Sequence, residues 1–455
     1  MTYLDAFSSV FNYYPNHFMT KVLFITIGGS HQPVVTSIKT QKPDRIIFIC
    51  SDGAKGSKSQ IIGDSKPCQV RRGAEILEEL PNIPIQLELG DRFAPERDMV
   101  LIAEPDDLSE CYNKISQKIY EVRQENSGYQ MVADYTGGTK TMSVALATAS
   151  LDNDVLLFIT TSTTRPNLIK VESGERTRRA QTIGVTVTRT IDKTLPMYLE
   201  SYNYGAAIAE MSNLMQTTEM SSDSSRRIAE LLDQCEGFDA WDRFDHRTAL
   251  LRLQPYMKLS NIQPYGLFLK KAIASRGQLE QGFDVSGGVN GHGYEVVDDL
   301  LLNANRRASQ QRYDDAVGRL YRAIELLEQI RLFRNYGILT IDVDVQKLPE
   351  ELQGEYAAMR SLRSGKVQIG LFQSYELLSQ LGNDPLGELF LLHREQILHS
   401  LEVRNNSLLA HGFAPVNGER YMAFYKVIGK FIQNGIAAVI PANSKTSALQ
   451  FPQSL

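Results

Sequence analysis

Short apolar runs rich in β-branched residues recur between residues 21 and 190 and alternate with longer stretches of mixed polarity. The five clearest runs are KVLFITI (21–27), RIIFIC (45–50), IPIQLEL (83–89), YQMVADY (129–135) and VLLFIT (155–160). Such continuous hydrophobicity is typical of strands buried on both faces, as in a parallel sheet. The stretches between them have helical character, most clearly at 57–79, 105–125 and 140–152. The alternation predicts a doubly wound, Rossmann-like α/β domain.

The β pattern ends near residue 195, after NLIKVES (167–173) and 182–190, which we expect to form a closing hairpin or edge strands. Helices separated by loops follow at 199–285, and the glycine-rich SGGVNGHG (286–293) predicts a flexible connector. Three-residue and four-residue apolar spacing predicts helices at 313–332, 385–411 and 419–437. The predicted ranges are an N-terminal extension (1–20), an α/β domain (21–195), a helical connecting region (196–290), an all-α domain (291–440) and a frayed polar tail (441–455).

Composition narrows the class of protein. The chain has 455 residues, of which 42% are hydrophobic and 22% charged, which excludes wholesale disorder. A net charge of −5 excludes a uniformly basic nucleic-acid coat. The four cysteines lack CxxC spacing, which excludes a zinc ribbon, and Cys50 ends an apolar run as a buried thiol would. We expect a cytoplasmic protein, because no signal peptide or membrane-spanning run stands out.

Two glycine-containing turns follow predicted strands and precede predicted helices. TIGGSHQP (26–33) ends the first strand, with Pro33 where a helix can begin, and DYTGGTKT (134–141) ends the fourth. Helix N-termini expose free N–H groups and a partial positive charge, which suits phosphate or carboxylate. In a sheet of order 3-2-1-4-5 the first and fourth strands are neighbours, so both turns face one crevice.

The two turns together favour an anion or nucleotide site, to which Lys140 adds a positive charge. Neither turn alone is diagnostic, because a tight turn between strand and helix serves packing equally well. GGTKT lacks the spacing of a P-loop, and GGS is not a dinucleotide fingerprint. CSDG (50–53) follows the second strand at the same edge but is better interpreted as an ordinary turn.

An arginine and a histidine are seven positions apart in RNNSLLAH (404–411), inside a predicted helix. Seven steps of about 100° place Arg404 and His411 on one helix face, separated by about 10 Å along the axis. The same face carries Ile397, Leu401 and Leu408. Two polar side chains in an apolar stripe predict packing against a surface that leaves a polar pocket, such as the same helix of a second subunit.

Two interpretations of this pair stay open. One is structural, with a histidine that caps a helix and an arginine at the surface. The other is metal-independent cleavage of RNA, in which a 2′-hydroxyl attacks the adjacent phosphate, His411 moves protons and Arg404 stabilises the phosphorane. Asn405 and Ser407 are placed to position RNA. The other histidines form no convincing metal set, so we predict no bound metal.

Together these motifs resemble the CARF–HEPN ribonucleases, ancillary effectors of type III CRISPR systems in the Csm/Csx group. DYTGGTKTMS is similar to the ligand-loop signature of CARF domains, and RNNSLLAHG is similar to the R-x4–6-H motif of HEPN domains. RYDDAVGRLYRAIELL is similar to the helix that accompanies that motif. The resemblance covers about residues 20–440, although 195–285 match no motif of the family and their role stays open.

The resemblance implies a homodimer that binds cyclic oligoadenylate as its allosteric activator across two CARF domains, with no cofactor. Binding would switch on a HEPN site, built from both protomers, that cuts single-stranded RNA without metal and leaves 2′,3′-cyclic phosphate and 5′-hydroxyl ends. The implied catalytic residues are Arg404 and His411, with Asn405 in support. The residues implied to contact the ring are Gly28, Gly29, Ser30, Thr136, Gly137, Gly138, Thr139 and Lys140. The resemblance also implies a functional link to a type III CRISPR effector complex.

Other functions compete with the gated ribonuclease. A CARF sensor would bind the ring and dock a partner without catalysis, although the Arg404–His411 pair favours a catalytic protein. A ring nuclease would degrade the ring itself, with Thr139, Lys140 or Ser30 orienting a ribose hydroxyl. A metal-dependent nuclease is disfavoured because no carboxylate cluster with an adjacent lysine stands out. The sequence sets neither the ring size nor the RNA sequence preference.

Overall fold

A computed structural model describes most of the chain and divides it into two compact units, residues 1–186 and 187–455. The described residues are 20–53, 56–63, 66–72, 75–162, 175–217, 220–280, 282–407, 412–441, 444 and 448–455. Nearly all of the predicted N-terminal extension, the segment NLIKVES and the predicted catalytic His411 therefore lie outside the described residues.

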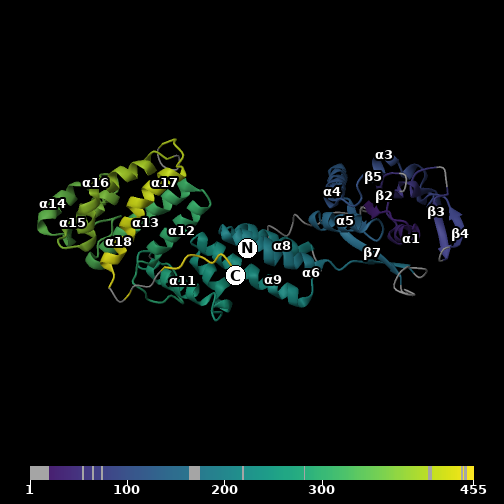
Figure 1. Ribbon diagram of the computed structural model, residues 1–455. Coiled ribbons are helices and arrows are strands. Elements are labelled where there is room, and N and C mark those ends of the chain that lie inside the picture. The colour runs from purple at the N-terminus through teal and green to yellow at the C-terminus, as the bar shows by residue number, and fades with distance from the viewer. Residues whose placement is uncertain are drawn as a thin grey trace. The chain divides into compact units, whose positions relative to one another are not determined.

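A six-stranded sheet forms the centre of the N-terminal unit, in the order β5-β2-β1-β6-β7-β8 (Figure 1). Its strands are β1 (Lys21–Thr26), β2 (Arg45–Ser51), β5 (Met99–Ile102), β6 (Gln130–Asp134), β7 (Leu156–Ser162) and β8 (Glu175–Arg179). The first five strands pair in parallel, and β8 pairs antiparallel with β7 at the edge. The predicted Rossmann-like fold is confirmed, and β1 and β6 are neighbours as the order 3-2-1-4-5 requires.

Helices cover both faces of this sheet because its strands are apolar on both faces. On one face, Val22 and Phe24 pack with α4 (Leu108–Glu125) and α5 (Lys140–Asp152). On the other face, Leu23 and Ile25 pack with α1 (Gln32–Gln41). Successive residues of β1 thus enter opposite cores, which fixes the register of the central strand.

Two expectations for the N-terminal unit are wrong. The run 83–89 forms the short helix α2 (Ile83–Gln86) and a turn, and the third parallel strand is β5. Pro84 explains this, since proline cannot donate to a central ladder and suits the first turn of a helix. The stretch 57–79 contains the 3₁₀ turn Ser57–Gln60 and an antiparallel hairpin of β3 (Cys68–Arg72) with β4 (Glu75–Leu80).

The segment 182–190 is also not a strand. It belongs to helix α6 (Ile183–Arg189), which runs on through a π-helical turn (Thr190–Thr194) into α7 (Leu195–Glu200). Only Val187 of α6 is buried. The β-branched residues of this segment therefore do not pack in a sheet, although residues of this type are common in strands. The division between the compact units falls inside this helical stretch, at residues 186 and 187.

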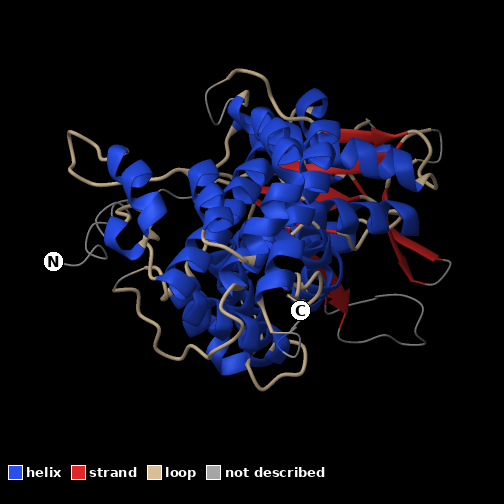
Figure 2. Cartoon of the chain, turned by 90° about the vertical axis from the view of Figure 1, so that its left-hand side faces the viewer, coloured by secondary structure: helices blue, strands red, loops and turns tan. Residues whose placement is uncertain are grey.

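The C-terminal unit is built from helices, as predicted; every strand of the described chain lies before residue 180 (Figure 2). After α7, its first part contains α8 (Tyr204–Thr217), α9 (Ser222–Asp242), α10 (His246–Leu253) and α11 (Gln263–Arg276). The rest contains α12 (Glu295–Ser309), α13 (Tyr313–Tyr336), α14 (Glu350–Ala358), α15 (Leu371–Gln380), α16 (Pro385–Asn405), α17 (Gly418–Phe424) and α18 (Lys430–Val439). Within the described residues, no helix has both the length and the apolar character needed to cross a membrane.

Two segments of this unit are held more firmly than the sequence suggested. In the glycine-rich segment 286–293, His292 is buried and its backbone N–H donates to Glu295. In the tail, which we expected to fray, Phe451 is buried and its ring lies 4.8 Å from that of Trp241. The Tyr204 hydroxyl also donates to the carbonyl of Pro452 at 2.7 Å. The end of the chain therefore returns to α8 and α9.

Candidate functional site

The two glycine turns of the α/β unit meet at the carboxyl ends of β1 and β6. The Thr26 hydroxyl donates to the Gly137 carbonyl at 2.7 Å. A Cβ added to Gly28 would lie 2.6 Å from the Gly138 nitrogen, and one added to Gly137 would lie 2.2 Å from the Thr26 oxygen. Gly138 also has a φ of +86°, which other residues rarely adopt. These three glycines therefore let the turns touch each other.

A buried acid holds the second turn. One oxygen of Asp134, at the end of β6, accepts from the backbone N–H of Thr136 at 2.9 Å and from the Thr136 hydroxyl. The other oxygen accepts from Ser37 at 2.6 Å and from Thr160 at 2.8 Å. Asp134 is fully buried, so these hydroxyl donors take the place of water. The network ties β6 to α1 and β7 beneath the crevice.

Three of the residues predicted to contact a ring are exposed, namely Gly29, Ser30 and Lys140. Nothing lies within 4 Å of a Cβ built on Gly29, so this position faces open space. The hydroxyl of Thr139 is engaged internally: it caps α5 by accepting from the Met142 N–H and donates to Pro105. The structure thus brings both turns together, with exposed groups from each.

A histidine beside this crevice was missed by the sequence analysis. His31 is the N-cap residue of α1 and is only 3% exposed. Burial lowers the pKa of its imidazole below the ordinary value of 6.5. Its place between the GGS turn and Pro33, at the predicted start of a helix, was the available signal.

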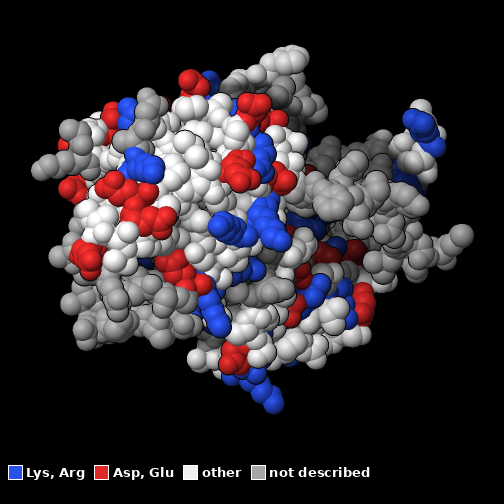
Figure 3. All heavy atoms as spheres, turned by 90° about the vertical axis from the view of Figure 1, so that its right-hand side faces the viewer, with Lys and Arg blue, Asp and Glu red and all other residues white. Residues whose placement is uncertain are grey.

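Charge on the surface is mixed. Figure 3 shows one face of the molecule, on which basic and acidic side chains are interspersed among uncharged ones. This agrees with a net charge of −5 for the whole chain. An anion bound on that face would be held by individual groups, such as helix N-termini and single lysines.

In the C-terminal unit, the prediction of one helix from 385 to 411 is wrong. Helix α16 ends at Asn405, and Ser407 already forms a bridge with Ala414. Asparagine and serine side chains compete for backbone hydrogen bonds, so the run Asn405–Ser407 favours a helix end. A Cβ on Gly412 would lie 2.1 Å from the Asn406 oxygen, so this close return of the chain requires glycine. The helix that carries Arg404 therefore ends at Asn405, and His411 lies outside the described residues.

Arg404 is held at this helix end by an aromatic ring. Its guanidinium carbon lies 4.3 Å from the centroid of Tyr321 in α13, and its Nη1 donates to Asn405 at 3.2 Å. Such a cation–π contact contributes roughly 0.5–2 kcal/mol and fixes the plane of the guanidinium. Burial, and then Glu325, raise the pKa of the Tyr321 hydroxyl, so the ring stays neutral. The sequence analysis missed Tyr321, although it lies in the helix that resembles the companion of the HEPN motif.

The apolar stripe of α16 packs within its own domain. Ile397 is 1% exposed and belongs to the domain core, and Leu401 packs against that core. At Ile397 and Leu401 the stripe therefore packs against its own domain, and not against a second subunit, which was the example given for the expected partner. A different set of α16 residues is exposed, namely Leu391, Leu392 and Leu398. Ser407 is buried, whereas Asn405 is exposed next to Arg404.

Part of the sequence and the fold as a whole are each similar to known proteins. Residues 289–434 match the family model described as the Csm6 HEPN domain, and both Arg404 and His411 fall inside this range. The structure of Enterococcus italicus Csm6 bound to cyclic hexa-2′-fluoro-hexa-dAMP is similar, with a TM-score of 0.52 and 12% identity, covering 93% of this chain and 96% of that one. The curated proteins contain no match.

Among the described residues, no group of three histidine, cysteine, aspartate or glutamate side chains is arranged to hold a metal ion. The predicted fold class and the resemblance to the CARF–HEPN proteins are both confirmed by these comparisons. The chain has a Csm6-like fold, with a Rossmann-like N-terminal domain followed by a helical domain that matches the Csm6 HEPN family.

Proposed function

We propose that this protein is a metal-independent endoribonuclease for single-stranded RNA, activated by cyclic oligoadenylate in type III CRISPR defence. One observation carries the proposal: the range that matches the Csm6 HEPN domain contains the whole motif RNNSLLAH. The crevice of the N-terminal unit supports the second part of the proposal, because it offers a place for an anionic activator. The four buried, free cysteines agree with action in a reducing cytoplasm.

The proposed cleavage is an internal transfer at phosphorus. The ribose 2′-oxygen forms a bond to the adjacent phosphorus while the bond from phosphorus to the 5′-oxygen breaks, leaving a 2′,3′-cyclic phosphate and a 5′-hydroxyl. His411 moves the proton lost by the 2′-hydroxyl or gained by the 5′-oxygen. Arg404 stabilises the extra negative charge of the phosphorane. The contacts of Arg404 with Tyr321 and Asn405 support this role, because they orient its guanidinium before RNA binds.

We propose that the activator is bound by the outward-facing parts of the two turns. Gly29 offers a backbone that a ligand can approach closely, and Ser30 and Lys140 offer a hydroxyl and a positive charge. The starts of α1 and α5 add free N–H groups. Gly28, Gly137 and Gly138 act indirectly, by holding the two turns together. The Enterococcus italicus relative was solved with a cyclic oligonucleotide, which supports this ligand class.

The experiment that tests the proposal is cleavage of a labelled single-stranded RNA in excess EDTA, with and without cyclic tetraadenylate or hexaadenylate. We expect cleavage with one of the two rings only, and that result would also give the ring size. Ring binding without any RNA cleavage would contradict the ribonuclease and favour a sensor. Loss of the ring itself during incubation, without RNA cleavage, would favour a ring nuclease.

A variant at His411, the proposed catalytic histidine, separates ring binding from RNA cleavage. His411→Ala is expected to lower the RNA cleavage rate by about 10²–10⁴-fold, the usual contribution of a general acid or base. Ring binding, measured by titration calorimetry, should be unchanged because the ring binds in the other unit. His399→Ala is the matched control, since the His399 side chain is 88% exposed on α16. Full activity in His411→Ala would refute the assignment.

A further inference from the structure

A polar cavity of about 760 Å³ opens in the C-terminal unit, where the ends of several helices meet. Its walls come from the turn before α8, the end of α9, the end of α12 and the first turns of α13. Four arginines line it, against two carboxylates. The arginines are Arg243, Arg307, Arg312 and Arg319.

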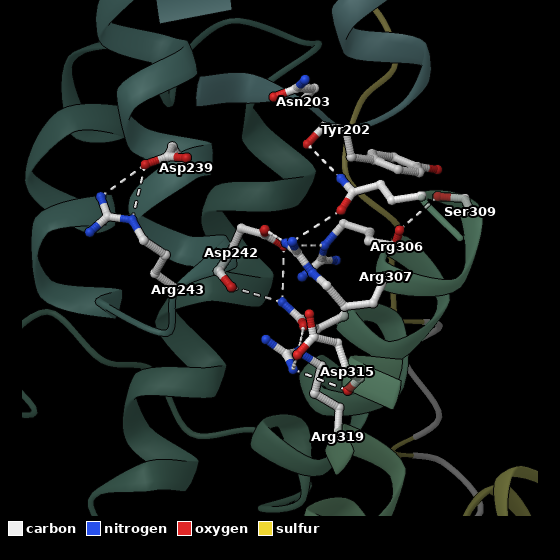
Figure 4. A network of polar contacts seen from close by, with 12 residues as sticks. Tyr202, Asn203, Asp239, Asp242, Arg243, Arg306, Arg307, Ser309, Asp315 and Arg319 are labelled. Carbon is white, nitrogen blue, oxygen red and sulfur yellow. Dashed lines mark hydrogen bonds and ion pairs between the residues drawn. The ribbon is translucent and has the colours of Figure 1, made fainter. Parts of the chain in front are cut away.

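Both carboxylates are already paired with arginines, and two of these arginines, Arg243 and Arg307, line the cavity themselves. Asp242 accepts from Arg306 Nε at 2.7 Å and from Asn303 at 2.9 Å, and its second oxygen pairs with Arg307. Asp239 pairs with Arg243 at 2.9 Å (Figure 4). Arg306 itself lies behind the wall and is fully buried. The acids therefore do not neutralise the remaining arginines of the cavity.

Positive charge exceeds negative charge in the cavity, because its lining has four arginines and two carboxylates, and Asp242 also pairs with Arg306. Arg307 is 9% exposed, and its Nε has no partner within the described residues. Arg319 donates to Asn303 at 2.5 Å and also forms an ion pair with Asp315 at 3.5 Å. Burial, followed by the charges of Arg319 and Arg312, lowers the pKa of Arg307. Cations that crowd each other in a partly buried cavity favour an anionic ligand.

Arg312 connects this cavity to the loop that follows the Arg404–His411 motif. Its side chain is exposed and lines a second hollow together with Phe413 and Pro415. The backbone N–H of Val416 donates to Asp314 at 3.1 Å, which fixes this loop against the start of α13. Phe413 is 90% exposed, and an exposed aromatic ring is a stacking surface for a base. Along α13, Arg312 and Tyr321 are nine positions, or about 13 Å, apart.

We propose that this arginine cavity binds the backbone phosphates of single-stranded RNA next to the cleavage site. The proposal rests on the proposed function and names a second contact region for its substrate. RNA cut at Arg404 would continue past Phe413 and Arg312 into the cavity. The guanidinium groups would neutralise phosphates in any sequence, so the cavity would add affinity and set a minimum substrate length.

The test is RNA binding by the full chain carrying Arg404→Ala, which prevents cleavage. Fluorescence anisotropy with an RNA of about 16 nucleotides compares this protein with versions that add Arg243→Glu and Arg312→Glu. Both side chains are exposed, so the fold should persist. We expect roughly tenfold weaker RNA binding. The slope of log K against log salt concentration should also become smaller by about 1.4, because each of the two lost phosphate contacts contributes about 0.7. Arg226→Glu, in an exposed pair with Asp223 at the start of α9, is the control.

A second readout uses cleavage by protein with Arg404 intact. The double variant should raise KM for the long RNA and leave kcat and the cleavage of an RNA of about four nucleotides unchanged. Unchanged RNA affinity and salt slope would overturn the proposal, as would an equal loss on long and short RNA. Wild-type protein that binds RNA in the anisotropy assay but never cleaves it would contradict the proposed function instead, and the cavity would still be tested.

Discussion

At the scale of single residues, the glycines of the crevice have two different tasks. Gly28 and Gly137 touch the opposite turn, whereas Gly29 has no atom near its Cβ position. Sequence alone does not separate these tasks, because all three are glycines in a turn after a strand. The distinction matters for function, since only an outward-facing glycine is available to a ligand.

Gly137→Ala is expected to force the two turns apart, because the new Cβ would lie 2.2 Å from the Thr26 oxygen. We expect a loss of roughly 1–3 kcal/mol in the free energy of unfolding of the α/β unit, together with loss of ring binding. Hydrogen exchange at β1 and β6, with ring titration, would measure both effects. Gly29→Ala should weaken ring binding and leave the exchange rates unchanged. Equal stability of the two variants would contradict this division.

His31 should make the stability of the α/β unit depend on pH. Its folded pKa is lowered below 6.5 by burial, so below pH 6.5 the unfolded chain binds a proton more readily than the folded chain. The free energy of unfolding should be constant above pH 6.5 on account of this group and fall as the pH drops below it. Urea unfolding between about pH 5 and 8 would measure the slope. His31→Gln should reduce the slope, whereas His399→Gln, at an exposed site, should not.

At the scale of elements, the sequence predicted the helices and strands that are defined by residues close to them in the chain. Helix α5 spans Lys140–Asp152, the predicted bounds, because Thr139 caps it and Asp134 anchors the turn before it. Strand β5 was missed because it has only four residues and follows the charged stretch that ends at Asp98, and only pairing with β2 defines it. The end of α16 was missed because its pattern of Arg404, Leu408 and His411 continues past Asn405, where side-chain competition ends the helix.

The C-terminal tail makes long-range contacts that the local sequence pattern does not predict. Gln450 and Phe451 both contact Arg306: the guanidinium donates to Gln450 at 2.7 Å and stacks 3.6 Å from the centroid of Phe451. Arg306 lies 144 positions before Gln450 in the chain. A polar sequence near a terminus predicts fraying by default, and only the aromatic pocket of α8 and α9 overrides that expectation.

Phe451→Ala should therefore destabilise the C-terminal unit by roughly 3–5 kcal/mol, the usual cost of removing a buried phenylalanine. The loss should appear as faster hydrogen exchange in α8 and α9, where Tyr204 and Trp241 line the pocket. Leu449→Ala is the matched control, because Leu449 is 37% exposed two positions earlier. If both variants unfold at the same urea concentration as the wild type, the tail does not contribute to stability.

At the scale of the whole molecule, the composite HEPN site that the family resemblance implies requires a dimer. The exposed Leu391 and Leu398 of α16 are seven positions apart and lie on one helix face, away from the buried Ile397. Exposed leucines at helical spacing favour contact with a second copy over contact with water. Arg404 is at the end of the same helix, so pairing through these leucines would bring two HEPN motifs into one interface.

Leu391→Asp with Leu398→Asp should convert the dimer to a monomer, because burying two carboxylates at an interface is costly. We expect sedimentation to show half the wild-type mass and RNA cleavage to fall below detection, since each protomer then lacks its partner's Arg404 and His411. Leu251→Asp, at a 70% exposed leucine of α10, should leave both mass and activity unchanged. A monomeric double variant that cleaves RNA at the wild-type rate would show that one protomer carries a complete site. A double variant that remains dimeric would place the interface on another surface.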